Sequence, residues 1–160
     1  KDNLQREAKL RGVNPSRLIF AKRMSKKDHL ARHQLADLFL DTFNFNAHST
    51  ASDALWGGLP IVTKIGEQFF ARCASSLLNA VGLPELIVKT EEEYEELSLK
   101  LATNKKLLST ITKKLKKNRL TTPLFDTQRY TQHLEQAFEK AYTLYENDNS
   151  PQNIWIQDKH

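Results

Sequence analysis

Cysteine, glycine and proline are all scarce in this sequence, and each scarcity excludes a class of protein. The 160 residues include one cysteine, Cys73, so no intrachain disulfide can form and a reducing compartment is favoured. Five glycines and five prolines are too few for a fibrous repeat or a low-complexity chain. We expect Cys73 to be a packed small residue rather than a nucleophile.

Long apolar runs are absent as well. No stretch is apolar over the roughly 18 residues that a membrane-spanning helix needs. The first residues, KDNLQREAKLRG, are too polar for a secretory signal. We therefore expect a cytoplasmic protein with no membrane partner. Because the sequence starts directly in an amphipathic pattern, we also expect it to be a piece of a longer protein.

The rest of the composition is that of a globular domain with a basic surface. Hydrophobic residues make up 39% and charged residues 27% of the chain, which at this length is enough to build a core. The formal net charge of +5 and the isoelectric point near 9.3 favour anionic ligands, without indicating which ones.

Short apolar segments alternate with helical patterns along the first part of the chain. The strand-length runs are residues 17–21, 38–42, 61–64 and 86–89, and the helical patterns cover about residues 25–37, 50–57 and 68–81. Near-continuous apolar runs are typical of strands that are buried on both faces. Since each interval has room for a crossover helix, the pattern predicts an α/β fold with a doubly wound parallel sheet.

Only helices are expected after the last of these strands. Thr90 is a plausible N-cap, and the glutamates that follow it suit the first turn of a helix. A Lys-rich amphipathic pattern comes next, Pro123 interrupts it, and a closing helix is expected over about residues 128–148. We expect one domain over residues 1–147, with these additional C-terminal helices, and a tail over residues 148–160.

Three potential cations recur on one face of the helix expected at residues 25–37. Lys26, His29 and Arg32 are three positions apart, so they fall within an arc of roughly 120°. They follow the apolar run 17–21, and ligands of open α/β sheets bind beyond the carboxyl ends of the strands. A solvated polar face accounts for the same spacing.

A second polar cluster stands in AHSTASDALWGG, where the helix near residues 50–57 should begin. Thr50 and Asp53 match a capping pattern, which needs no ligand. A helix N-terminus also presents unpaired N–H groups and about half a positive charge to a phosphate. His48, Ser49 and Thr50 would add donors, while Asp53 suits sugar hydroxyls. A bare cap also accounts for this stretch. Two such clusters after neighbouring predicted strands support a nucleoside diphosphate more strongly than either cluster alone.

Other chemistries lack a signature. The sequence contains no P-loop and no G-x-G-x-x-G, and it supports no catalytic triad. His29 and His33 are four residues apart but lack companion ligands at zinc spacing, so no metal is expected.

The lysines within residues 105–119 have no interleaved aromatics, and glutamates precede them, so a solvated face without a nucleic-acid partner is favoured. The alternative function is a non-catalytic α/β module that binds protein or nucleic acid through this Lys-rich helix.

Three stretches together carry a resemblance to a known family: DHLARHQLADLFLDT, AHSTASDALWGG and PLFDTQRYT. They resemble the C-terminal half of the catalytic region of the O-linked N-acetylglucosamine (O-GlcNAc) transferases, including the SPINDLY proteins, over about residues 1–147. The resemblance implies the UDP-binding, Rossmann-like half of a GT-B fold. It also implies an inverting, metal-independent transfer of a sugar, N-acetylglucosamine by expectation, from a UDP-sugar to Ser or Thr of acceptor proteins. No separate cofactor is expected.

The resemblance implies that the first polar cluster (Lys26, His29 and Arg32) and Asp53 bind the nucleoside. The resemblance implies that His29 and Arg32 contact the uracil, the first by stacking and the second through a carbonyl. Met24 matches a position whose backbone meets the uracil. Lys26 and Asp53 match positions that hold the ribose.

The resemblance implies that the second polar cluster (His48, Ser49 and Thr50) binds the diphosphate and lies near the sugar. The resemblance implies that Ser49 and Thr50 bind the diphosphate, with His48 close to the diphosphate and the sugar. Phe45 matches the point where a loop approaches the N-acetyl group. The diphosphate-binding lysine and the acceptor-side histidines of the family would lie upstream of this sequence. We therefore expect no catalytic residue here, no transfer by this chain alone, and dependence on the missing N-terminal half of the catalytic region. In the family, tetratricopeptide repeats often precede that region.

Overall fold

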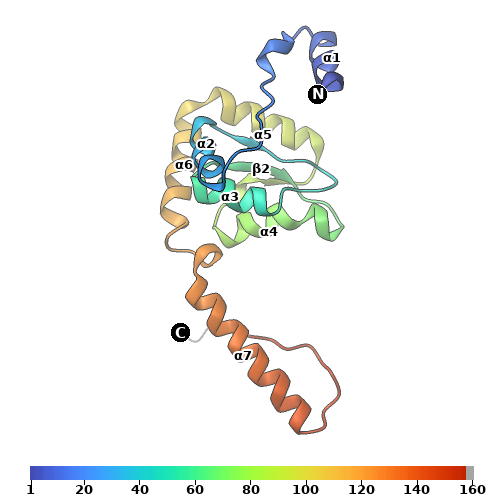
Figure 1. Ribbon diagram of the computed structural model, residues 1–160, viewed down its shortest axis with the longest axis vertical. Helices are drawn as coiled ribbons and strands as arrows, with labels where there is room; N and C mark the ends of the chain where they lie inside the picture. Colours follow the sequence, from blue (N-terminus) through green and yellow to red (C-terminus); the bar gives the residue numbers. More distant parts are fainter. Residues whose placement is uncertain (158–160) are drawn as a thin grey trace.

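Three short parallel strands form the centre of the structure, a computed structural model that describes residues 1–157 (Figure 1). The strands are β1 (Phe39–Leu40), β2 (Ile61–Lys64) and β3 (Ile87–Val88), in the order β1-β2-β3. In the parallel register Phe39 lies opposite Ile61, and Thr63 lies opposite Ile87. The predicted α/β fold with a parallel sheet is confirmed, although two of the strands are shorter than their apolar runs.

Helices connect and cover the strands. The helices are α1 (Asp2–Leu10), α2 (Lys26–Arg32), α3 (Ser49–Gly57), α4 (Cys73–Ala80), α5 (Glu91–Thr103), α6 (Lys105–Asn118) and α7 (Thr127–Glu146). Short 3-10 turns occupy Pro15–Arg17, His33–Leu35, Phe69–Ala71, Pro84–Leu86 and Pro123–Phe125. In Figure 1, α4 lies below the strands and α5 above them. The helix predicted over 25–37 is therefore α2 followed by a 3-10 turn, and the one predicted over 68–81 is a 3-10 turn followed by α4.

The predicted strand over residues 17–21 is wrong. After the turn at Pro15–Arg17 the chain has no regular structure until α2, and Ile19 is 89% exposed. Within residues 1–157 no strand pairs with this segment. An apolar run becomes a strand only where a neighbour accepts and donates its backbone hydrogen bonds, and local sequence does not reveal whether that neighbour is present.

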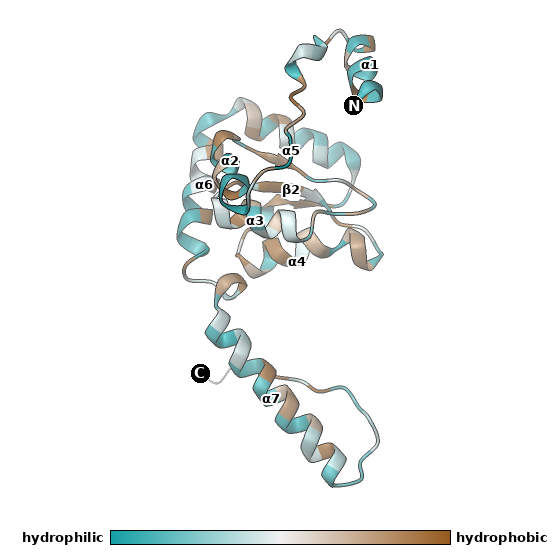
Figure 2. Ribbon diagram, viewed as in Figure 1, coloured by the Kyte–Doolittle hydropathy of each residue, from teal (hydrophilic) through white to brown (hydrophobic). Residues whose placement is uncertain are grey.

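One hydrophobic core lies between the sheet and its helices. Its fully buried members come from every layer: Ala54 and Leu55 of α3, Ile61 and Val62 of β2, Leu78 of α4, Leu101 of α5 and Leu115 of α6. The first three residues of β2 are buried, as expected for a central strand with covered faces. Figure 2 shows the same division, with apolar strands inside and hydrophilic outer faces on α5 and α6.

The C-terminal helices begin as the sequence predicts. The Thr90 hydroxyl accepts a hydrogen bond from the Glu93 N–H (3.2 Å) and the Glu93 carboxylate accepts one from the Thr90 N–H (3.2 Å), a complete capping box. The helix α7 has no buried residue and projects away from the sheet (Figure 1). The chain then returns beside α7, where the Lys140 ammonium donates to the Trp155 carbonyl (2.7 Å).

The division into a domain over 1–147 and a tail over 148–160 stays a prediction, and residues 158–160 lie outside the described part. No helix within residues 1–157 is long and apolar enough to cross a membrane.

Candidate functional site

A buried carboxylate organises the loop at the carboxyl end of β1. Asp41 is 5% exposed and accepts hydrogen bonds from the Thr63 hydroxyl (2.7 Å) and from the N–H groups of Ala47 (2.7 Å) and Thr42 (2.9 Å). Because a buried carboxylate is stable only with such donors, this arrangement fixes the loop to β1 and β2. Asp41 thereby sets where the chain enters α3.

The start of α3 has no side-chain cap among the described residues. The helix begins at Ser49 with His48 as its N-cap residue (φ −105°, ψ −95°). The predicted capping pair of Thr50 and Asp53 is wrong, because Thr50 already lies within the first turn. Ser49 and Thr50 are both exposed, so two hydroxyls and the first N–H groups of a nine-residue helix face the same open region.

Asp53 instead joins α3 to α2. The Lys26 ammonium donates to Asp53 Oδ2 (2.5 Å), and His29 Nε2 lies 3.5 Å from the same oxygen. The side chain of Asp53 is only 20% exposed, whereas that of Lys26 is 67% exposed. The structure therefore brings together residues from the two polar clusters that the sequence placed on separate helices.

The imidazole of His29 is biased towards its neutral form. Burial lowers its pKa below the ordinary 6.5, and the nearby Arg32 and His33 lower it further, while Asp53 opposes them. The His33 ring meets the His29 ring edge-on, with centroids 4.8 Å apart. A neutral imidazole at pH 7 offers a flat face for stacking against a base.

Arg32 and Met24 lie at the margin of this cluster. The Arg32 guanidinium donates to the Lys22 carbonyl (3.4 Å), which ties the segment before α2 to the helix. Met24 belongs to that segment and is 42% exposed. The structure thus places Arg32 at the end of α2 and Met24 in the segment just before it.

His48 lies in a group of aromatic rings at the other end of the site. Its ring stacks on Phe45, with centroids 4.8 Å apart and an interplanar angle of 11°. Phe45 in turn stacks on Phe70 (4.9 Å), and Phe69 meets His48 edge-on. Within the described chain, the buried His48 Nε2 has no hydrogen-bond partner. The rings fix the imidazole beside the first turn of α3.

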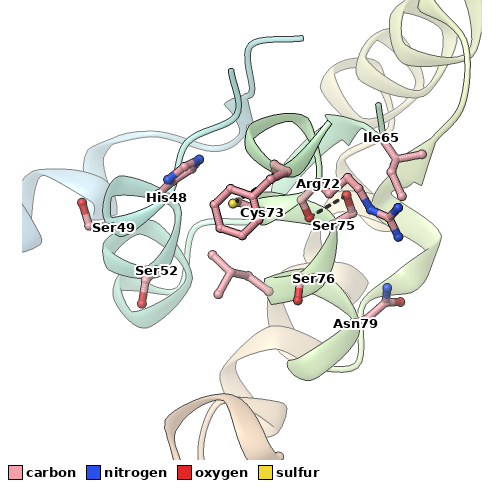
Figure 3. A pocket seen from close by; sticks show the side chains of 11 residues that line it. His48, Ser49, Ser52, Ile65, Arg72, Cys73, Ser75, Ser76 and Asn79 are labelled. Atoms are coloured by element: carbon pink, nitrogen blue, oxygen red, sulfur yellow. Dashed lines mark hydrogen bonds between the residues drawn. The ribbon is translucent and has the colours of Figure 1, made fainter. Parts of the chain in front are cut away.

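A cavity of about 730 Å³ opens between α3 and α4 next to His48 (Figure 3). Its polar wall includes Ser49 and Ser52 from α3 and Ser76 from α4. The thiol of Cys73 is half-buried in the same wall and donates to the Phe69 carbonyl (3.4 Å). Most of the cavity surface is apolar, with Ile65, Phe69 and Leu77 in its wall, and the hydroxyls provide a few polar contacts beside the start of α3.

Sequence reasoning missed two features of the site. The first is Asp41, which holds the loop after β1 through its hydrogen bonds. The sequence feature that could have indicated it is an acidic residue at the end of an apolar run, in LFLDT. Phe69 and Phe70 complete the aromatic group, but nothing in the sequence connects them with His48, about twenty positions away. No group of three or more metal-ligating side chains occurs among residues 1–157.

A parallel sheet whose first strand ends in a polar loop and a helix start is the arrangement of Rossmann-like α/β domains, which bind ligands beyond the carboxyl ends of their strands. A solved structure supports this assignment. A mutant of the O-GlcNAc transferase of Thermobaculum terrenum matches with a TM-score of 0.81 and 33% identity, over 88% of this chain and 27% of that chain. The chain belongs to glycosyl transferase family 41, whose sequence model matches residues 1–134.

Curated relatives agree with this membership. The chain is 42% identical to the probable UDP-N-acetylglucosamine–peptide N-acetylglucosaminyltransferase SEC of Arabidopsis thaliana over 93% of its length. It is 38% identical to the UDP-N-acetylglucosamine–peptide N-acetylglucosaminyltransferase of Caenorhabditis elegans over 86% of its length. It spans only 15% and 12% of those two proteins. The predicted family resemblance is confirmed, and the relatives are glycosyltransferases by name.

Proposed function

We propose that this chain is the UDP-binding part of a protein O-glycosyltransferase, with the nucleotide held between α2 and the start of α3. One observation carries the proposal: Lys26 and His29 of α2 converge on Asp53 of α3, directly beside the uncapped first turn of that helix. A lysine cation, an imidazole ring, an acceptor and free N–H groups are the partners that a base, a ribose and a diphosphate need.

The nucleoside would occupy the α2 side of the site. His29, neutral at pH 7, stacks on the uracil, and Arg32 reaches a carbonyl of the base. Met24 contributes its backbone in the segment that Arg32 holds. Asp53 accepts from the ribose hydroxyls, and Lys26, already paired with it, donates to them. Asp53 is thus oriented before the ligand arrives.

The diphosphate would occupy the start of α3. The N–H groups of the first turn and the hydroxyls of Ser49 and Thr50 stabilise the charge that develops on the leaving diphosphate as the glycosidic bond breaks. The ring of His48, fixed against Phe45, lies where the phosphate meets the sugar. These donors supply leaving-group stabilisation from this chain's own residues.

The donor and acceptor are inferred from the relatives. Their names specify UDP-N-acetylglucosamine and peptide, so we propose UDP-N-acetylglucosamine as donor and Ser or Thr hydroxyls of proteins as acceptors. Transfer would require the N-terminal half of the catalytic region, since no acceptor-activating base is assigned within this chain. The single cysteine supports a reducing, cytoplasmic location. Family membership disfavours the alternative of a non-catalytic module as the main function.

A titration of UDP into the chain, followed by NMR, tests the proposal. UDP should shift resonances at His29, Arg32 and residues 49–53, with larger shifts than UMP or ADP at equal concentration. The Thr50→Val variant removes one hydroxyl without changing size and should weaken UDP binding about tenfold, the usual loss for a hydrogen bond to a charged group.

The matched control is Thr110→Val, on an exposed face of α6, which should leave the affinity unchanged. Equal weakening by both variants, or no shifts at these residues with millimolar UDP, would contradict the assignment.

A further inference from the structure

We propose that the chain carries a second site, a basic groove along α6 that binds an acidic peptide segment. This site is separate from the UDP site. The groove has a volume of about 960 Å³, and its walls are α6 on one side and the connection from α2 to β1 on the other. It includes Leu38 and Pro60, the residues before β1 and β2, and so opens at the amino ends of these strands. The proposed UDP site lies beyond the opposite, carboxyl ends.

One stripe of α6 supplies the charge. Lys105, Lys113, Lys116 and Arg119 line the groove, and Asp37 is the acidic residue in its wall. From Lys105 to Arg119 the stripe extends for about 21 Å at the usual helical rise. A peptide of about six extended residues covers the same length. Four cations over this distance complement a run of carboxylates along such a peptide.

The inner end of the groove holds two buried nitrogens that lack hydrogen-bond partners within residues 1–157, His33 Nδ1 and Arg119 Nε. The Arg119 guanidinium is held in place, because it donates to the Trp56 carbonyl and lies 5.7 Å from the centre of the Trp56 ring. His33 is only 7% exposed. A buried polar nitrogen without a partner costs free energy. Because neither nitrogen is exposed to solvent, a carboxylate seated at this end would reach them after a small side-chain shift and would then accept from the Arg119 N–H.

Two glycines at the end of α3 border this end of the groove. A Cβ atom at Gly57 would lie 3.0 Å from the Cβ of His33, so the glycine permits the close approach of the two segments. Gly58, with φ +85°, ends α3 in the left-handed conformation, which favours glycine at this position.

The composition of the walls favours a peptide over a nucleic acid. Within the described chain no Phe, Tyr or Trp lines the groove, so bases would have no ring on which to stack. Leu38, Pro60 and Leu108 form apolar stretches that suit the aliphatic parts of glutamate side chains. The Ser109 hydroxyl can bond a peptide backbone, and the Thr112 hydroxyl, which donates to the Leu108 carbonyl (2.9 Å), can still accept from a peptide N–H.

The test measures binding of a fluorescein-labelled hexaglutamate peptide to the chain by fluorescence anisotropy at low and physiological salt. Hexaglutamine of the same length should not bind. The double variant Lys113→Gln/Lys116→Gln should weaken hexaglutamate binding roughly tenfold through the loss of two ion pairs. The matched control, Lys106→Gln/Lys117→Gln, removes the same charge from the same helix outside the groove and should change the affinity by less than about twofold.

Several outcomes would overturn the proposal. Absence of hexaglutamate binding, or equal weakening by both double variants, would mean that α6 is only a diffuse cationic face. Displacement of the peptide by UDP would assign the binding to the nucleotide site. Tighter binding of a thymidine hexanucleotide than of hexaglutamate would assign the groove to nucleic acid. Since UDP binding is measured separately, failure of this proposal leaves the UDP site untouched, and the reverse also holds.

Discussion

At the scale of single residues, two carboxylates set the geometry of the candidate site. Asp41 is buried and holds the loop after β1 by accepting two N–H groups and one hydroxyl. Asp53 is partly exposed and orients Lys26 and His29 across the gap between α2 and α3. Asp41 is buried and mainly fixes the backbone of a loop, whereas Asp53 is partly exposed and pairs with side chains only, so their substitutions should have different consequences.

The titration of His29 follows from its surroundings. We expect a pKa below 6.5 in the folded chain, measured from the ring resonances by NMR, and an ordinary value of about 6.5 in urea. Because the folded-state pKa is depressed, the stability that this residue contributes is present above pH 6.5 and is lost as pH falls through the folded-state value. Asp53→Asn removes the one carboxylate that raises this pKa and should lower it further. A folded-state midpoint at or above 6.5 would contradict the electrostatic account.

Asp41→Asn should reduce the stability of the whole domain. The amide has one acceptor oxygen where the carboxylate has two, so at least one buried donor loses its partner, at a cost of about 1–3 kcal/mol. The measurement is urea unfolding followed by circular dichroism. Asp37→Asn, an exposed acid before β1, serves as the control and should shift the free energy of unfolding by less than about 0.5 kcal/mol. Equal effects of the two variants would show that Asp41 does not hold the loop.

At the scale of elements, α5 follows β3 directly and also contacts the loop after β1 through Tyr94. The Tyr94 hydroxyl donates to the Asp41 carbonyl (2.9 Å), so α5 also supports the loop before α3. Burial, together with the Asp41 carboxylate, raises the pKa of Tyr94 to about 12. Neutralising that carboxylate in Asp41→Asn should therefore bring the pKa of Tyr94 below about 12, which a spectrophotometric titration would show.

Thr90→Ala tests the capping box of α5. The substitution leaves the Glu93 N–H without its acceptor and should lower the free energy of unfolding by about 1 kcal/mol. Thr110→Ala in the interior of α6 is the matched comparison, because its hydroxyl bonds only the Lys106 carbonyl one turn back. Alanine has the higher helix propensity there, so that variant should be neutral or slightly stabilising. Similar losses in both variants would argue against a specific cap.

At the scale of the whole molecule, the sheet and its covering helices form the folded body, whereas α1 and α7 project from it (Figure 1). Neither α1 nor α7 has a buried residue. The core residues all lie between Ala51 and Leu115. Stability should therefore reside in the part of the chain that carries the candidate site.

A chain that ends at Asp126 should keep the stability and UDP affinity of the longer chain. We expect a free energy of unfolding within about 0.5 kcal/mol of the original value, since α7 contributes no buried residue. Hydrogen exchange in the full chain provides an independent measure. Amides of β2 should exchange much more slowly than amides of α7. Loss of cooperative unfolding on truncation would show that α7 contributes to the fold.

The sequence predicted those features that depend on neighbouring residues. The apolar runs of β1, β2 and β3, the capping box of Thr90 and the break at Pro123 are all visible within a few positions. The two polar clusters were identified from their helical spacing and from their place after apolar runs. The roles given to individual site residues stay predictions, and the UDP titration is their test.

Only the tertiary structure decided which partners these residues have. Thr50 and Asp53 satisfy a capping pattern, yet Asp53 binds Lys26, 27 positions earlier, and the helix begins before Thr50. Residues 17–21 satisfy a strand pattern, yet no strand within residues 1–157 pairs with them. The reason is the same in both cases. Propensity and periodicity act over a few residues, whereas a hydrogen bond or a strand pair requires a partner that the folding of distant segments must bring into place.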